Sequence, residues 1–230
     1  MTPPATFRSG LFAALPIAMG YLPIAFSFGV AATRAGLSEA ETVMLSLVIY
    51  AGAAQFLALA LITSGAPLIL SAFTLIAMNM RHLLYGPSLL KAAGQGASTG
   101  RAWAWAFGLT DEVFGAALGH LARGGRFSEP FMLGLSLGAY ASWVGGTGLG
   151  AVAGGGALQD WPALDAGLGF MLPALFLALL LSILTRPQLP AITVAALVTV
   201  GVTLGLSPTA GILCGMCAGA AAGVLGRRAA

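Results

Sequence analysis

The sequence predicts an all-α integral membrane protein, a bundle of about eight (seven or eight) transmembrane helices. Hydrophobic residues make up 58% of the 230 residues and charged residues only 7%, whereas an ordinary soluble domain is about one quarter charged. Apolar runs repeatedly reach the roughly 20 residues that a helix needs to cross a bilayer. The apolar runs do not alternate with polar residues, which argues against an outer-membrane barrel.

Eight apolar runs, bounded by charges or by proline and glycine clusters, are expected to span the membrane. They cover residues 10–32, 42–63, 67–90, 102–121, 131–152, 163–185, 189–206 and 209–226. The connections between them are short, so residues 1–230 are expected to form a single transmembrane domain. The first run is expected to be retained as a span because no small-residue cleavage site follows it.

The first run is interrupted by Pro16, Gly20 and Pro23. Proline removes a backbone donor and clashes with the preceding turn, which leaves carbonyl groups near Gly20 without partners. Lipid tolerates such groups only where they are satisfied or face a protein-lined cavity. A functional break and a plain proline-kinked helix both fit this pattern. A similar glycine and proline cluster at residues 167–173 raises the prospect of an inverted repeat, as in many transporters.

Polar side chains interrupt the second and third runs. A glutamine among small residues, Gln55, either binds a ligand or bridges helices. In the third run, Arg81 marks either a membrane interface or a functional site, because a cation is costly in hydrocarbon. Arg81 offers a bidentate contact to a carboxylate and His82 titrates near neutral pH, whereas the alternative is an arginine that reaches lipid headgroups. Helical spacing pairs Asn79 with His82, and Arg81 with Tyr85.

The fourth run contains two adjacent acids, Asp111 and Glu112, deep among apolar residues. Adjacent residues on a helix point about 100° apart, so the two carboxylates need separate roles. Helical spacing places Glu112 on the face of Gly108 and other small residues, where another helix can come close. The functional interpretation is a cation or proton site. The alternative is a structural ion pair with Arg81.

The remaining patterns indicate packing and exclude several function classes. Glycines recur every fourth residue in the last run and predict a packed face, internal or with a partner subunit: Gly211, Gly215, Gly219 and Gly223. Cys214 and Cys217 lack a third metal ligand and a redox context. Nucleotide-binding and hydrolytic motifs are missing, so no enzyme activity, cofactor or metal is expected. The basic residues are scattered, which argues against nucleic-acid binding.

Three motifs, in order and approximate spacing, resemble the AzlC family, the large subunits of bacterial branched-chain amino-acid exporters. They are A-G-A-A-Q-F at residues 51–56, N-M-R-H-L-L-Y at 79–85 and L-T-D-E-V-F at 109–114. The resemblance is strongest over residues 10–120. Ala54 and Gly86 depart from the family pattern, which has serine at or near these positions, and these changes bear on substrate selectivity.

The resemblance implies a multi-pass secondary transporter of the bacterial cytoplasmic (inner) membrane. Such a protein exports valine, leucine, isoleucine and sometimes methionine, is driven by protons, and works with a small AzlD-like membrane subunit. Its other partners would be the lipid bilayer and a second copy of the chain. A non-coupled channel or facilitator, and a structural membrane subunit without transport activity of its own, remain open as alternatives.

A zwitterionic substrate needs a donor for its carboxylate, an acceptor for its ammonium group and an apolar pocket for its side chain. Backbone amides of the broken first span are expected to share the first two tasks with polar side chains, and a carboxylate is expected to supply negative charge. The expected substrate-binding residues are Gly20, Pro23, Gln55, Asn79 and Arg81, and the expected proton-coupling residues are Asp111, Glu112 and His82.

Overall fold

The computed structural model describes residues 5–94, 97–155, 161–163, 166, 167, 170, 174, 177, 180, 181 and 184–228. All regular elements among these residues are helices. The chain divides into two compact units: Met1–Ala60 with Ala77–Met171, and Leu61–Ile76 with Leu172–Ala230. Each unit is described by itself, and the single domain expected from the sequence stays a prediction.

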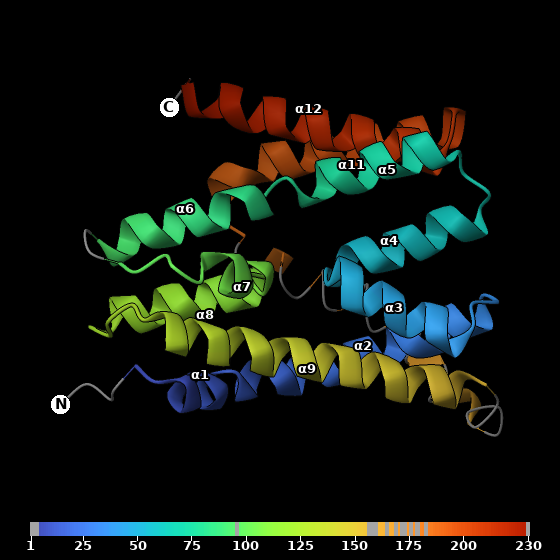
Figure 1. The fold of residues 1–230 in the computed structure, drawn as a ribbon. Coiled ribbons are helices and arrows are strands. Elements are labelled where there is room, and N and C mark those ends of the chain that lie inside the picture. Colours follow the sequence, from blue (N-terminus) through green and yellow to red (C-terminus); the bar gives the residue numbers. More distant parts are fainter. Residues whose placement is uncertain are drawn as a thin grey trace. The chain divides into compact units, whose positions relative to one another are not determined.

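Helix α9 (Glu129–Gly154) forms the centre of the first unit, with α1 (Phe7–Ala13) and α2 (Leu15–Arg34) packed along it (Figure 1). The helices touch through glycines in reciprocal pairs. A Cβ atom on Gly10 would overlap the carbonyl oxygen of Phe131, and one on Gly134 would overlap that of Phe7. Further along, Gly138 lies against Leu11 and Ala14. From Gly10 and Phe131 to Ala14 and Gly138 the residue numbers rise together, so α1 and α9 run in the same direction, with backbones as close as small residues permit.

The same arrangement recurs further along, where α2 meets the second half of α9. Gly29 lies against the backbone of Thr147, and Gly150 lies against the backbone of Phe26. These four positions are buried or nearly so, and Phe28 on the same helix is fully buried. The contact between α2 and α9 is therefore the scaffold on which the other helices of this unit are placed.

Three of the predicted spans are each divided into two helices by a short non-helical segment. The second span consists of α3 (Glu39–Ile49) and α4 (Gly52–Thr63), the third of α5 (Leu68–Asn79) and α6 (His82–Ala93), and the fourth of α7 (Ala102–Phe107) and α8 (Asp111–Ala122). Each division falls in or directly beside one of the three motifs recognised in the sequence. The motifs therefore mark helix breaks, where backbone groups lose their helical partners.

The break expected in the first span near Gly20 and Pro23 is wrong. Helix α2 is continuous from Leu15 to Arg34, with Pro23 inside it, and the chain bends instead at Ala14, one residue before α2 begins. Pro16 lies in the first turn of α2, where its missing N–H would have no partner in any case. Pro23 removes a single donor, and the close packing of α2 on α9 keeps the helix intact around it.

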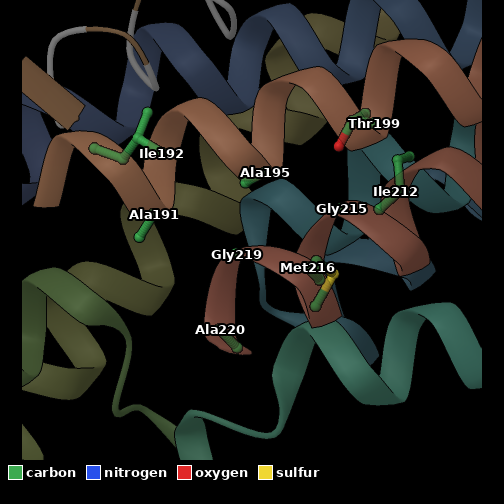
Figure 2. Close-up of a pocket in the computed structure, with 9 residues that line it drawn as sticks. All are labelled: Ala191, Ile192, Ala195, Thr199, Ile212, Gly215, Met216, Gly219 and Ala220. Carbon is green, nitrogen blue, oxygen red and sulfur yellow. The ribbon is translucent and has the colours of Figure 1, made fainter. Parts of the chain in front are cut away.

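The second unit contains a pair of antiparallel helices, α11 (Leu189–Gly205) and α12 (Pro208–Arg228), with the short turn η1 (Arg186–Gln188) before them. The glycine face predicted on the last span is internal, because it packs on α11. Gly211 lies against Thr203, and Gly215 lies against Thr199. An open groove of about 410 Å³ is lined by residues of both α11 and α12 (Figure 2). Thr199 carries the only hydroxyl group among these lining residues.

Four helical segments among the described residues are long and apolar enough to cross a membrane, by length and composition. They are Leu15–Arg34, Leu68–Ala93, Arg186–Gly205 and Pro208–Gly226. The expected all-helical membrane fold is confirmed at this level, whereas the number of eight spans is not. The predicted span at 163–185 and the cluster at 167–173 lie mostly outside the described residues, so the inverted repeat stays a prediction.

Candidate functional site

The two adjacent carboxylates lie in the first turn of α8. Thr110 is the N-cap of this helix, and its hydroxyl accepts a hydrogen bond from the backbone N–H of Val113 at 3.3 Å. Free N–H groups and the helix dipole favour negative charge at this end of a helix. The expectation that Glu112 shares a helix face with Gly108 is wrong, because Gly108 caps the end of α7. Threonine followed by two acids is itself a helix-start signal.

Glu112 is held from α2. The hydroxyl of Tyr21 lies 2.5 Å from Oε2 of Glu112 and 2.6 Å from Oγ1 of Thr110. Tyr21 is buried, and its ring meets the indole of Trp143 edge to face with the ring centres 5.1 Å apart. Residues from α2, α8 and α9 thus fix one carboxylate in a half-buried position inside the first unit.

Asp111 faces another helix. Its Oδ2 atom lies 2.9 Å from a guanidinium nitrogen of Arg81, and its Oδ1 atom accepts a hydrogen bond from Tyr85. The side chains of Arg81 and Asp111 are 46% and 40% exposed, so the pair lies at the edge of the unit. The ring of Tyr85 stacks on Phe114 of α8.

Several expectations about these residues are settled by this geometry. The two acids have different partners, as helix geometry predicts, although their roles stay a prediction, and Arg81 and Tyr85 both reach Asp111 from one side of α6. The ion pair between Arg81 and Asp111, which the sequence left as an alternative, is present. The shared helix face of Asn79 and His82 is wrong, because α5 ends at Asn79 and α6 begins at His82. The His82 ring instead packs against Tyr85.

Tyr50 occupies the break between α3 and α4 and was missed by the sequence analysis. Its backbone is left-handed, with φ 37° and ψ 49°, which is uncommon for a bulky residue. The side chain is 5% exposed and packs against Phe107 and Tyr140. Its hydroxyl lies near Thr110 and Glu112, but with no described residue does it meet the distance and angle of a hydrogen bond. An aromatic residue directly before Ala51 and Gly52 was the available signal.

We call Tyr21, Tyr50, Thr110 and Glu112 the α8 cluster. It joins α2, the break between α3 and α4, and the start of α8. The ion pair of Asp111 with Arg81 adds the break between α5 and α6 on the neighbouring residue. The breaks of all three divided spans lie in the first unit, and they therefore come together at the N-terminus of α8.

Gln55 belongs to a second polar group, separate from the α8 cluster. Its Nε2 donates to Oγ of Ser46 at 2.7 Å, and its Oε1 accepts from the indole N–H of Trp143 at 2.8 Å. Ser46 in turn lies 2.7 Å from the hydroxyl of Thr147. We call these four residues the Gln55 network. Gln55 is fully buried and connects α3, α4 and α9, which is the helix-bridging role that the sequence left open.

The remaining predicted site residues are Gly20, Pro23 and Asn79, and none of them is a member of the α8 cluster as defined above. Gly20 and Pro23 are exposed on α2, and it is Tyr21 between them that reaches Glu112. Asn79 is half-buried at the end of α5. Within the described part of the chain, no group of three or more histidine, cysteine, aspartate or glutamate side chains is placed to hold a metal ion.

Comparison with protein families gives a match between residues 16–156 and the AzlC protein family, which is more than half of the chain. The chain belongs to the AzlC family. The matched residues include α2, all three helix breaks and the whole α8 cluster of this AzlC protein, and they end before α11 and α12. The resemblance seen in the sequence is thereby confirmed.

Relatives of this AzlC chain are membrane proteins. The inner membrane protein YgaZ of Escherichia coli (strain K12) is 48% identical over 217 residues, or 92% of this chain and 88% of YgaZ. An uncharacterized membrane protein of Archaeoglobus fulgidus is 45% identical over 181 residues, or 77% of this chain and 75% of that protein. The branched-chain amino acid transport protein AzlC of Bacillus subtilis (strain 168) is 27% identical over 176 residues, or 76% of this chain and 66% of that protein.

No solved structure matches this AzlC chain significantly. The family, the names of its relatives and its long apolar helices together identify a multi-pass protein of the bacterial inner membrane, in an amino-acid transport family.

Proposed function

We propose that this protein is a secondary transporter that exports branched-chain and similar small apolar amino acids, coupled to protons and working with a small AzlD-like membrane subunit. Its family and the name of the Bacillus subtilis relative support the substrate class. The observation that carries the proposal is the meeting of three broken helices at the N-terminus of α8. In secondary transporters, substrates and coupling ions bind where helices are interrupted.

The α8 cluster and its surroundings supply the groups that a zwitterion needs. The carboxylate of Glu112 accepts the substrate's ammonium group. The first N–H groups of α4, which begins at Gly52 just after the Tyr50 break, have no partner within their helix and attract a carboxylate. The ring of Phe107, stacked on Tyr50, provides an apolar wall for a branched side chain.

Proton coupling follows from competition for one carboxylate. Glu112 can hold either the ammonium group of the substrate or a proton. Once it is protonated it has no negative charge, and it binds the ammonium group more weakly. Alternation between the two on opposite sides of the membrane exchanges an outgoing amino acid for an incoming proton. Asp111 contributes through its ion pair with Arg81, which holds α6 against α8, and His82 modulates that contact through Tyr85.

The test is leucine transport by the full chain in proteoliposomes, with and without a co-reconstituted small subunit. An imposed pH gradient is expected to drive leucine uptake against its gradient. Glu112→Gln is expected to lose the response to the gradient by roughly tenfold or more, because a general acid–base group typically contributes at least that much. Glu39→Gln, a carboxylate exposed at the start of α3, is the matched control and should retain it.

Other outcomes separate the alternatives. Leucine flux that ignores the pH gradient would identify a non-coupled channel or facilitator. No flux with any amino acid, with or without the small subunit, would leave a structural membrane role. If Asp111→Asn and Glu112→Gln both keep proton-coupled leucine transport, the carboxylate part of the proposal is wrong.

A further inference from the structure

Three tyrosines lie close together in the first unit, and only one of them lacks a hydrogen bond. Within the α8 cluster, the hydroxyl of Tyr21 is in hydrogen-bond distance of Thr110 and Glu112. Tyr140 donates to the carbonyl oxygen of Leu47 at 2.8 Å. Tyr50 packs edge to face on Tyr140, with the ring centres 4.8 Å apart, and its hydroxyl is unpartnered among the described residues. Buried polar groups nearly always have a partner, because leaving one unpaired is unfavourable.

Tyr50 carries a second unfavourable feature that is independent of its hydroxyl. Its left-handed backbone, with φ 37°, suits glycine and is disfavoured for a large side chain. The next glycine, Gly52, is already the first residue of α4, so the left-handed backbone falls on Tyr50 and not on a glycine. Strained backbones that persist in folded proteins cluster at ligand sites and switch regions. Strain and an unpaired buried hydroxyl on one residue together indicate a group kept for a ligand.

We infer that Tyr50 is a specificity-determining residue whose hydroxyl donates a hydrogen bond to the carboxylate of a zwitterionic, apolar amino acid, beside Glu112. The inference rests on the proposed function and deepens it by naming the group that recognises the substrate's acid end. It goes beyond the residues singled out in the sequence, where Tyr50 carried no role.

The direction of this hydrogen bond follows from the charges around Tyr50. Glu112 is the negative group of the cluster and attracts the ammonium end of the substrate, with Tyr21 already donating to its Oε2 atom. The carboxylate end, two bonds away from the ammonium nitrogen, then needs a donor close to Glu112. The phenol of Tyr50 is such a donor, it lies near enough to Glu112 to feel its charge, and hydrogen bonds to a charged acceptor are stronger than neutral ones.

The ring of Tyr50 fixes where that donor stands. It stacks on Phe107 with the ring centres 6.1 Å apart and the planes 30° from parallel. The ring of Tyr140 packs against it edge to face. Because Tyr140 is itself bonded to α3, the phenol has little freedom to turn away. The hydroxyl is thus positioned before the substrate arrives, which reduces the entropy lost on binding.

The experiment compares Tyr50→Phe with Tyr140→Phe in the full chain in lipid nanodiscs, measuring the Kd for L-leucine and the midpoint of thermal unfolding. Tyr50→Phe is expected to weaken leucine binding by roughly tenfold, the loss of one hydrogen bond to a charged group. Its unfolding midpoint should equal or exceed that of the unchanged protein. Tyr140→Phe, which loses a satisfied hydrogen bond, should unfold at a lower temperature and serves as the control for stability alone.

Two analogues test which end of the substrate Tyr50 contacts. Isoamylamine is leucine without its carboxylate, and 4-methylpentanoate is leucine without its ammonium group. Tyr50→Phe is expected to bind isoamylamine as the unchanged protein does, and to lose affinity for 4-methylpentanoate. An equal loss for isoamylamine and leucine would overturn the inference. A lowered unfolding midpoint with unaltered leucine affinity would do the same, because it would give the hydroxyl a structural role.

Failure of the inference can be told apart from failure of the proposed function. If the unchanged protein binds leucine and Tyr50→Phe binds it equally well, the transporter proposal stands and the role of Tyr50 falls. If the unchanged protein binds none of leucine, valine, isoleucine and methionine, the proposed substrate class falls and the inference with it.

Discussion

The Gln55 network and the α8 cluster are two polar groups within one apolar unit, and they differ in how completely their atoms are paired. In the Gln55 network, both ends of the Gln55 amide and the indole N–H of Trp143 have partners. In the α8 cluster, the hydroxyl of Tyr50 has none among the described residues, and its backbone is strained. Trp143 touches both groups, since its ring also packs on Tyr21.

This difference separates structural from functional polarity inside a membrane protein. A polar group in an apolar environment is costly either way, so its presence alone does not reveal its role. A saturated network specifies how helices fit together, whereas an incomplete one retains binding capacity for a ligand. Gln55 and Glu112 both appear in the sequence as polar residues inside apolar runs, and their partners in the structure distinguish them.

The largest expected effect removes both groups at once. Gly29→Val places a side chain against the backbone of Thr147 and Ala151, which cannot give way. Because α2 and α9 together carry Tyr21, Trp143 and Thr147, their separation would disrupt the α8 cluster and the Gln55 network. A destabilisation of at least about 3 kcal/mol is expected from such overpacking. Thermal unfolding in detergent, together with the yield of monodisperse protein, measures it.

The matched control is Gly20→Val on the same helix, where a Cβ atom would meet nothing within 4 Å. This variant should fold normally. If it folds but loses leucine transport, the substrate-binding role expected for Gly20 from the sequence gains support. If Gly29→Val unfolds at the same temperature as the unchanged protein, the close packing of α2 on α9 is wrong.

The next effect in size isolates the Gln55 network. Gln55→Leu keeps the volume of the side chain but leaves the indole N–H of Trp143 without its acceptor. We expect a loss of about 2 kcal/mol in the free energy of unfolding, the usual cost of a buried unpaired donor. Leucine binding, measured in the folded fraction, should change little. Normal stability combined with lost leucine binding would instead make Gln55 a substrate ligand, as the sequence first indicated.

Much of the site could be read from the sequence because helix breaks in a membrane leave chemical traces. The threonine before Asp111 and Glu112 is a helix cap, and the two acids needed separate partners because of helix geometry alone. Arg81 was recognised as a partner for a carboxylate on charge alone. These inferences depend on local rules that hold wherever a helix begins.

The rest depended on contacts between distant segments. Pro23 indicated a broken helix, but α2 is continuous and packs on the glycines of α9, and this fit is visible only when both helices are placed. The left-handed backbone of Tyr50 occurs where its ring packs on Phe107 and Tyr140, which lie far along the chain. Tertiary contacts overrode local propensity at both positions.

A smaller effect is expected for the ion pair of Arg81 and Asp111. In its pairing and exposure it is intermediate between the Gln55 network and the α8 cluster. It is paired like the Gln55 network, but its side chains are 46% and 40% exposed. A double-mutant cycle of Arg81→Gln and Asp111→Asn on the free energy of unfolding should give a coupling of about 1 kcal/mol or less, as partly exposed pairs do. A coupling several times larger would mean that the pair is buried in the assembled protein.

The smallest expected effect concerns the start of α9, the helix that carries Trp143, which touches both polar groups. The backbone N–H of Arg101 donates to Glu129 at 2.6 Å, and Trp105 and Ser98 add two further hydrogen bonds. These bonds, the one from Arg101 first, hold the pKa of Glu129 below its usual value of about 4.5. The ionised carboxylate therefore stabilises the folded state in full above that value, and this contribution is lost as the pH falls through the lowered pKa.

Glu129→Gln tests this pH-dependent stabilisation at the N-terminal end of α9. The variant has no carboxylate to titrate, so its unfolding midpoint should lie below that of the unchanged protein near neutral pH, and the gap should narrow as the pH falls below about 4. Unfolding midpoints measured across this range in detergent decide it. A gap that widens toward low pH would mean that the folded protein favours the protonated acid. The hydrogen bonds to Glu129 would then contribute nothing to holding the start of α9, and with it Trp143, in place.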